Sequence, residues 1–135
     1  MASPTAHYVV LILESHLDIF GHMNNASYLV LFEEARWDLI TRNGYGLRQV
    51  QEVQKGPIVL ELTMKFRREI NLREKILIKT ELVDYTGKIG HFRQEMIKED
   101  GTLATELSLA MGLFDMKERK LIEPTSEWKK AIGFA

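Results

Sequence analysis

The chain has 135 residues, with 18 Lys plus Arg against 19 Asp plus Glu, a formal net charge of −1 and no Cys. This length suits one domain whose core needs no metal or disulfide support. The missing Cys excludes disulfides, thiol nucleophiles and Cys-ligated metal sites. The balanced charge argues against a nucleic acid as the main partner, because such binding requires an excess of basic residues on one face.

Neither of the two longest charge-free stretches predicts a membrane segment. They cover residues 1–13 and 19–32, and both are shorter than the roughly 20 apolar residues that a membrane-spanning helix requires. The first also lacks the basic start of a secretory signal. We therefore expect a cytoplasmic protein without membrane insertion, organised as a single domain over residues 1–135.

The first third of the chain predicts a strand followed by a long helix. Residues 7–13 form a short β-branched run that is typical of a strand covered on both faces. Over residues 27–42 apolar side chains recur at helical spacing and spread over more than one stripe. Asn24 and Asn25 suit the start of this helix, and the segment 42–44 suits its end.

After a connector over residues 44–56, the pattern changes to alternation of apolar and polar side chains. This period of two predicts four strands, over residues 58–66, 74–86, 88–99 and 102–116. Asp100-Gly101 is a hairpin turn signal before the last strand, and residues 125–132 predict a short terminal helix. We expect the four strands to form an antiparallel meander.

These elements predict an α+β fold in which an antiparallel five-stranded sheet wraps around the long central helix. A helix with so wide an apolar surface must bury several faces, and a curled sheet provides that cover. Such a sheet keeps two open edges, and pairing two copies edge to edge closes one edge of each. We therefore expect at least a homodimer, and a homotetramer stays open.

The loop between the first strand and the helix concentrates polar groups, chiefly Asp18, His22, Asn24 and Asn25. They directly precede a helix N-terminus, where unpaired N–H groups and the macrodipole favour negative charge. A carboxylate beside such a helix end supplies the two parts that hydrolysis of an ester or thioester needs: a nucleophile or general base, and an oxyanion stabiliser. Taken singly, each residue more often serves as a cap, a turn or a structural group, and the spacing matches no metal-binding pattern.

Two segments resemble the signature of a known enzyme family. They read HLDxxGHxNNAxYL over residues 16–29 and EEARWD over residues 33–38. They are similar to hot-dog-fold acyl-CoA thioesterases of the branch related to 4-hydroxybenzoyl-CoA thioesterase, and within it to the bacterial long-chain acyl-CoA thioester hydrolases. The resemblance implies a hot-dog fold and hydrolysis of an acyl-CoA substrate to a free acid and CoA. We expect no metal and no other cofactor.

The resemblance implies catalytic roles for four residues of the loop. The family's carboxylate matches Asp18, which acts either as the nucleophile, through an acyl-enzyme anhydride, or as a general base toward water. The family polarises the thioester carbonyl with a backbone N–H at the start of the central helix, which matches Asn25. His22 and Asn24 match the element that orders the loop and the carboxylate through hydrogen bonds.

The resemblance also implies residues that bind the substrate. Gly21 belongs to the D-x-x-G element, and Tyr28 matches an aromatic pocket wall in the first turn of the helix. Apolar side chains suited to an acyl chain between helix and sheet are Met23, Leu31, Met64, Phe66 and Met111. The phosphates of CoA require a cationic patch, and its candidates are Arg67, Arg68, Arg73 and Lys75, with Lys88 and Arg93 on the next strand. The alternative for these basic residues is a salt-bridged sheet edge.

Some features depart from the family pattern and keep alternatives open. Many relatives carry a second acidic residue two or three positions before the catalytic one, whereas Glu14 lies four positions before Asp18. Some relatives use a Glu in the middle of the central helix, which keeps Glu33 and Glu34 as alternatives. Hot-dog hydratases typically pair Asp with a His five positions later, one more than separates Asp18 from His22. A non-catalytic acyl-thioester binding module is the remaining alternative.

Overall fold

The computed structural model describes residues 5–133. In chain order its elements are β1 (Ala6–Leu11), a short 3-10 turn (Glu14–His16), α1 (Asn25–Arg42), α2 (Leu47–Val53), β2 (Lys55–Phe66), β3 (Lys75–Thr86), β4 (Ile89–Lys98), β5 (Leu103–Asp115), β6 (Lys120–Ile122) and α3 (Ser126–Ala131). None of the helices in this range is long and apolar enough to cross a membrane. Each predicted element is present with its ends shifted by a few residues.

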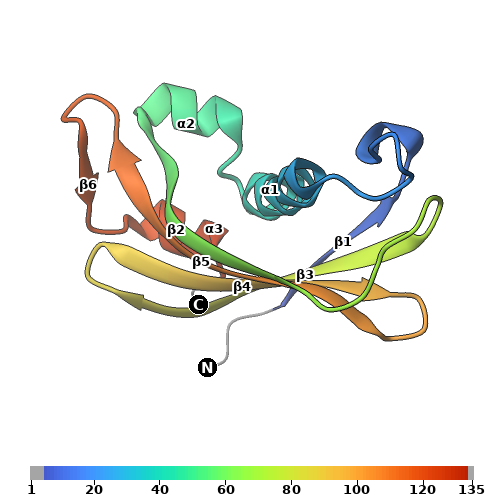
Figure 1. Cartoon of the computed structure of the whole chain (residues 1–135). Coiled ribbons are helices and arrows are strands. Elements are labelled where there is room, and N and C mark those ends of the chain that lie inside the picture. The colour runs from blue at the N-terminus through green and yellow to red at the C-terminus, as the bar shows by residue number, and fades with distance from the viewer. Residues whose placement is uncertain (1–4, 134–135) are drawn as a thin grey trace.

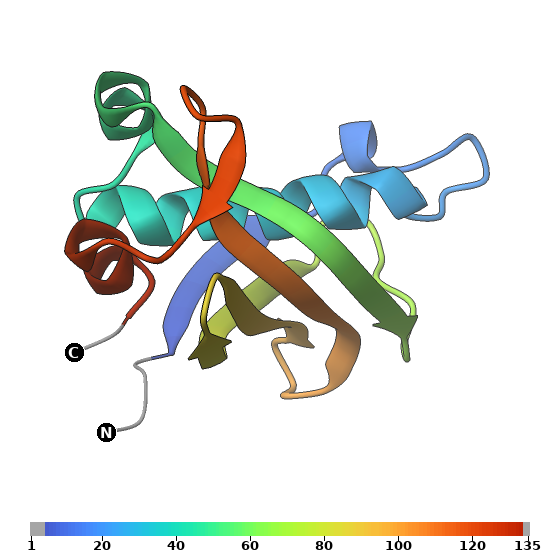
Figure 2. The ribbon, with the colours of Figure 1, turned by 90° about the vertical axis from the view of Figure 1, so that its left-hand side faces the viewer.

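A single antiparallel sheet forms the base of the molecule. Its strand order is β1-β3-β4-β5-β2, and the short β6 pairs with β5. The sheet curves, and α1 lies in its concave face (Figure 1). In the view turned by 90°, α1 runs lengthwise across the strands (Figure 2). The predicted α+β architecture of an antiparallel sheet around a long helix is confirmed, with six strands instead of five.

The sequence prediction missed α2 and β6. α2 lies in the segment that was expected to be a plain connector, and it buries only Val50. A seven-residue helix with one buried side chain leaves almost no apolar period in the sequence. β6 spans three residues, which is too short for alternation to be recognised.

The predicted four-strand meander is wrong in one respect. β3, β4 and β5 form a meander, but β2 pairs with β5 and not with β3. Tight turns at Gly87 and Gly101, both with positive φ, join the strands that are neighbours in the sheet. The longer segment 67–74 instead carries the chain from β2 to β3. As a result β2 is an edge strand.

The core lies between α1 and the concave face of the sheet. The residues that α1 buries are Tyr28, Leu31, Phe32, Ala35 and Ile40. Facing them are alternate side chains of the central strands, including Ile76, Ile78, Met96 and Leu107. Toward the other end of the molecule the fully buried Trp128 of α3 packs edge to face on Tyr45, with ring centroids 5.6 Å apart.

Both edge strands expose apolar side chains. The exposed apolar residues of β2, each between 36% and 51% exposed, are Ile58, Val59, Leu60, Leu62 and Phe66. At the opposite edge, Val9 of β1 is 64% exposed. The prediction that the first strand is covered on both faces is therefore wrong for the single chain, because β1 is an edge strand whose side chains alternate between partial burial and exposure.

A buried polar network ties α1 to the sheet. Gln94 of β4 is fully buried, and its Nε2 donates to the Phe32 carbonyl oxygen over 3.1 Å and to Thr80 Oγ1 over 2.9 Å. Its Oε1 accepts a hydrogen bond from Arg36 Nη1 over 2.9 Å. Because burial of an amide is costly unless its donors and acceptor are satisfied, this network sets the position of α1 over β3 and β4.

A buried threonine of β3 predicts what the loss of one bond of this network does to stability. Thr80 Oγ1 accepts the hydrogen bond from Gln94. Thr80→Val leaves a buried amide donor unpaired and should lower the free energy of unfolding by about 1–3 kcal/mol. Thr86→Val, at an exposed position of the same strand, is the matched control and should change that free energy by less than about 0.5 kcal/mol. Urea unfolding of both variants measures the difference, and equal losses in the two would contradict it.

Candidate active site

The segment between β1 and α1 folds back on itself as a narrow hairpin. Leu17 and Met23 form an isolated antiparallel bridge, and the Asp18 N–H donates to the His22 carbonyl oxygen over 2.8 Å. Gly21 closes the turn with a φ of 78°, a conformation that favours glycine. The hairpin therefore holds Asp18 beside the residues that lead into α1.

Backbone groups of this hairpin orient the Asp18 carboxylate. Its Oδ1 accepts hydrogen bonds from the Phe20 N–H over 2.9 Å and the His22 N–H over 3.1 Å. Its Oδ2 has no hydrogen-bond partner in the part of the chain that the structure describes, and the side chain is exposed. The imidazole of His22 instead lies 3.6 Å from a carboxylate oxygen of Glu69, in the segment after β2. One oxygen of Asp18 is thus held and the other is available for chemistry.

The start of α1 keeps one backbone donor unpaired. Asn24 is the N-cap, and its Oδ1 accepts from the Ala26 N–H over 2.8 Å. Its carbonyl oxygen accepts from the N–H groups of Ser27 and, more weakly, Tyr28. The Asn25 N–H has no partner among the described residues. An unpaired N–H at a helix N-terminus is a ready hydrogen-bond donor to an anionic oxygen.

Aromatic side chains border this helix end on the side of β2. Tyr28 is 6% exposed, and its ring packs edge to face on Phe66 with centroids 4.9 Å apart. Burial raises the pKa of the Tyr28 hydroxyl, and the charge of Glu69 raises it further. The hydroxyl is therefore a weaker acid than that of a free tyrosine, which suits a pocket wall better than a proton donor. Met64 lies two residues before Phe66 on β2 and packs partly against the core.

The basic residues near the end of β2 differ in how they are partnered. Arg67 is paired with Glu106 of β5, and Arg73 Nη2 donates to both carboxylate oxygens of Glu14, over 2.7 and 2.9 Å. The hydrogen bond from Arg73 lowers the pKa of the Glu14 carboxyl. Arg68 is exposed and forms no ion pair with any described residue, and its Nη1 donates to the Arg67 carbonyl oxygen. Arg67 and Arg73 thus form salt bridges, as the alternative interpretation of these basic residues expected. The charge of Arg68 is free to bind an anion.

The two acidic residues in the middle of α1 lie away from its N-terminus. Glu34 accepts a hydrogen bond from the Tyr8 hydroxyl over 3.3 Å. Glu33 is exposed and borders a pocket between α1 and β2 together with Arg36. Because neither carboxylate belongs to the hairpin or to the first turn of α1, Asp18 remains the carboxylate nearest in the chain to the unpaired Asn25 N–H.

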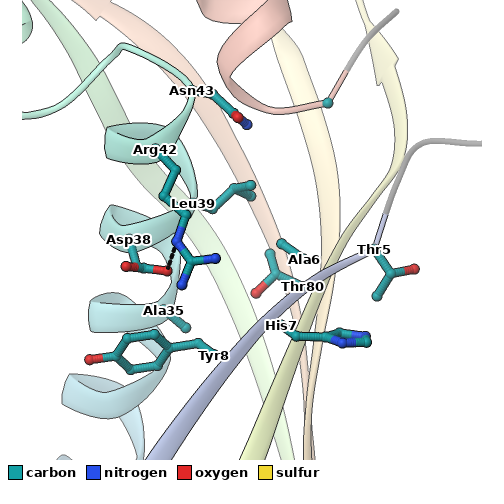
Figure 3. Close-up of a pocket in the computed structure, with 11 residues that line it drawn as sticks. Thr5, Ala6, His7, Tyr8, Ala35, Asp38, Leu39, Arg42, Asn43 and Thr80 are labelled. Atoms are coloured by element: carbon teal, nitrogen blue, oxygen red, sulfur yellow. Dashed lines mark ion pairs between the residues drawn. The ribbon is translucent and has the colours of Figure 1, made fainter.

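A separate hollow of about 320 Å³ lies between β1 and the C-terminal half of α1 (Figure 3). Asp38 and Arg42 face it from the helix, and they form an ion pair at 2.8 Å. The negative charge of the Asp38 carboxylate is therefore already balanced by Arg42. The hollow also lies at the end of α1 opposite to Asn25. We place the candidate active site at the hairpin and not in this hollow.

The sequence interpretation missed the partners of Arg36. Gln94 lies between Phe92 and Met96 on the buried face of β4, and a polar residue in the apolar phase of a strand is a signal of a buried hydrogen-bond network. Gln94 could therefore have been recognised from the sequence as a buried polar residue. Its partners on α1 and β3 lie far away along the chain, so only the fold reveals them.

Comparison with known proteins now gives the family. A family model described as the thioesterase-like superfamily matches residues 13–132. The chain belongs to this superfamily. The matched range includes the Asp18 hairpin, all of α1 and the sheet from β2 onward, so the similarity predicted from the sequence is confirmed.

Individual relatives agree with the family. Long-chain acyl-CoA thioesterase FadM of Escherichia coli K12 is 27% identical over 118 residues, covering 87% of this chain and 89% of that protein. Acyl-CoA thioester hydrolase YbgC of Escherichia coli O6:H1 is 23% identical over 107 residues, covering 77% and 80%. The structure of the hypothetical protein SAV2348 from Staphylococcus aureus in complex with CoA superposes with a TM-score of 0.88 at 20% identity, covering 98% of this chain and 84% of that one. This structural similarity shows the hot-dog fold.

Proposed function

We propose that the chain hydrolyses acyl-CoA thioesters to free acids and CoA, with Asp18 as the catalytic carboxylate. The observation that carries this proposal is one hairpin that holds both an available Asp18 oxygen and, at the start of α1, the Asn25 N–H, unpaired within residues 5–133. Membership in the thioesterase-like superfamily and the names of the two E. coli relatives support it. The cytoplasm is the location we expect for this activity.

The chemistry needs only these two groups and a good leaving group. Negative charge develops on the thioester carbonyl oxygen when its carbon is attacked, and the Asn25 N–H with the dipole of α1 stabilises that charge. As a general base Asp18 takes a proton from the attacking water; as a nucleophile it forms an anhydride that water then cleaves. In both routes the C–S bond breaks and the CoA thiolate leaves, so little acid catalysis is required.

The neighbouring residues position these groups and shape the entry of the acyl chain. His22 holds Asp18 through its backbone N–H, and the Asn24 cap sets the direction of the first turn. The turn at Gly21 brings the two sides of the hairpin together. Tyr28 and Phe66 form an apolar wall beside the start of α1, which suits the first methylene groups of an acyl chain.

Asp18→Asn should abolish most of the activity. The amide keeps the size of the side chain but is neither a competent nucleophile nor a base, so kcat for thiol release from an acyl-CoA should fall at least about a hundredfold. Asp38→Asn, in the separate hollow, is the matched control and should retain activity. Thiol release is followed with a chromogenic disulfide, and thermal unfolding shows that both variants fold. Wild-type turnover in Asp18→Asn would move the chemistry to Glu33 or Glu34.

We propose that Arg68 is the principal contact for the phosphates of CoA, with Arg67 and Arg73 in secondary roles. Arg67 and Arg73 already bind carboxylates, whereas Arg68 forms no ion pair with a described residue and lies two positions after Phe66. A guanidinium without a carboxylate partner is well suited to bind phosphate.

Arg68→Ala should raise KM for an acyl-CoA by roughly tenfold, which corresponds to the loss of one charge-assisted hydrogen bond. KM for the matching acyl-pantetheine, which lacks the nucleotide phosphates, should not change. Arg48→Ala, on α2 and in an exposed pair with Glu52, is the control and should leave both KM values unchanged. Equal increases of KM for both esters would contradict a phosphate contact at Arg68.

We further propose that the active site is complete only in a homodimer formed through β2. β2 is a 12-residue edge strand with a row of exposed apolar side chains, and such an edge favours pairing with a second copy. In the single chain the tip of the hairpin is open to water, with Ile19 94% and Phe20 77% exposed. Because water weakens the hydrogen bonds that stabilise an oxyanion, a partner that shields this hairpin would strengthen catalysis.

Leu62→Glu, in the middle of β2, should shift the protein toward monomers and lower activity in parallel. The added charge must be desolvated when two β2 strands pair, which opposes association. Val9→Glu, on the opposite sheet edge, is the matched control and should leave the oligomer intact. Size-exclusion chromatography with light scattering gives the mass, which also separates a dimer from a tetramer. An unchanged mass in Leu62→Glu would exclude β2 as the interface.

A further inference from the structure

A mostly apolar pocket lies beside α1, and it contains a guanidinium with unpaired N–H donors. The pocket has a volume of about 290 Å³ between α1, the start of β2 and β5. Its walls are mostly apolar, from Trp37, Ile40, Pro57, Ile58, Val59, Met111 and Trp128. The two charged residues that line it are Arg36 and Glu33. A volume near 300 Å³ is in the range of small-ligand sites.

Arg36 makes fewer hydrogen bonds than a guanidinium can. Of its five N–H donors, one is used in the described chain, by Nη1 to Gln94 Oε1. Glu33 is close enough for its charge to raise the pKa of Arg36, but the two form no ion pair in residues 5–133, and burial lowers that pKa more strongly. No nitrogen of Arg36 is among the fully buried polar atoms that lack a hydrogen-bond partner in this range. The remaining donors of Arg36 are therefore accessible to a ligand in the pocket.

The network beneath Arg36 holds this cation in place. Gln94 uses its amide nitrogen on Phe32 and Thr80, so its Oε1 faces Arg36 and fixes one end of the guanidinium. A neutral amide oxygen does not neutralise the charge. A cation held among apolar walls with a free planar edge is a preorganised receptor for a carboxylate, which binds such an edge with two parallel hydrogen bonds.

We propose that this pocket binds the far end of the acyl group and that Arg36 recognises a terminal carboxylate there. The preferred substrates are then CoA thioesters of dicarboxylic acids. This inference rests on the proposed thioesterase function and adds the substrate class to it. It gives the partly buried charge of Arg36 an anionic partner inside a pocket whose other walls are mostly apolar.

The geometry of α1 and β2 sets the length of that acyl group. Phe66, near the end of β2, contacts Tyr28 in the first turn of α1, and Ile58, near the start of β2, lines the pocket with Arg36. The start of α1 and the pocket thus lie toward opposite ends of β2 along the same helix. Arg36 follows Asn25 by eleven residues, a rise of about 16 Å, and its side chain leans back toward the N-terminus. With C–C bonds of about 1.5 Å, on the order of a dozen carbons span this distance.

The test compares matched substrates on the wild-type protein. Dodecanedioyl-CoA should have a kcat/KM about tenfold or more above that of dodecanoyl-CoA, the effect expected of one charge-assisted hydrogen bond. Hexanedioyl-CoA is too short to reach Arg36 and should show no advantage over hexanoyl-CoA. This comparison needs no substitution, so it does not depend on the folding of a variant.

Substitution of Arg36 then assigns the preference. Arg36→Met should reduce the ratio of kcat/KM for dodecanedioyl-CoA to that for dodecanoyl-CoA to about one, whatever loss the two esters share, and Arg36→Lys should restore part of the ratio, because Lys keeps the charge but not the planar fork. Arg42→Met, on the same helix but outside this pocket, is the control. Circular dichroism and light scattering check fold and mass.

The outcomes separate this inference from the function on which it rests. If no acyl-CoA in the panel releases thiol, the thioesterase proposal fails. If all substrates are hydrolysed without preference for the longer dicarboxylic ester, only the role of Arg36 is overturned. The role of Arg36 is also overturned if Arg36→Met lowers turnover of every substrate equally and weakens the oligomer, because its free edge then binds a carboxylate of a second copy.

Discussion

The hydrogen bonds of one buried amide set the position of the central helix. Gln94 joins the Phe32 carbonyl oxygen and the Arg36 guanidinium of α1 to Thr80 of β3. A slide of α1 by one turn, about 5.4 Å, would remove both helix partners from Gln94, and a buried amide without partners is costly. The same bonds draw Arg36 in beside apolar side chains. One network therefore sets the position of the unpaired Asn25 N–H at the start of α1 and leaves a partly buried cation beside the helix.

The start of α1 shows how a capping residue can leave a donor for catalysis. The first four N–H groups of a helix have no partner within it. Asn24 satisfies those of Ala26, Ser27 and, weakly, Tyr28 through its side-chain and backbone oxygens, and it does not reach that of Asn25. The hairpin simultaneously uses one oxygen of Asp18 on its own backbone. The two groups proposed for the reaction, the second oxygen of Asp18 and the Asn25 N–H, are thus the ones that the loop does not use for its own hydrogen bonds.

Local patterns explain what could be predicted from the sequence. Periodicity located α1 and the long strands, and residue types with their spacing singled out Asp18 and Asn25. Strand order was not accessible, because alternation shows which face is buried and not which strand is adjacent, and β2 was therefore placed beside the wrong neighbour. The pairing of Arg73 with Glu14 was equally hidden, since 59 residues separate them. The neutral composition gave no indication of which basic residues would be left without a carboxylate.

That distribution of charge is informative in the folded chain. Several carboxylates near the sheet are committed to Arg side chains, as in the cluster of Glu106 with Arg67 and Arg93. Near the gap between α1 and β2, Arg68 and Arg36 have no ion-pair partner in the described range. Arg68 follows the end of β2 that contacts the first turn of α1, and Arg36 lies beside the opposite end of β2. An elongated substrate with an anionic group at each end matches this placement. In the binding mode that we propose, the phosphates of CoA contact Arg68, the thioester lies between Asn25 and Asp18, and the acyl terminus contacts Arg36.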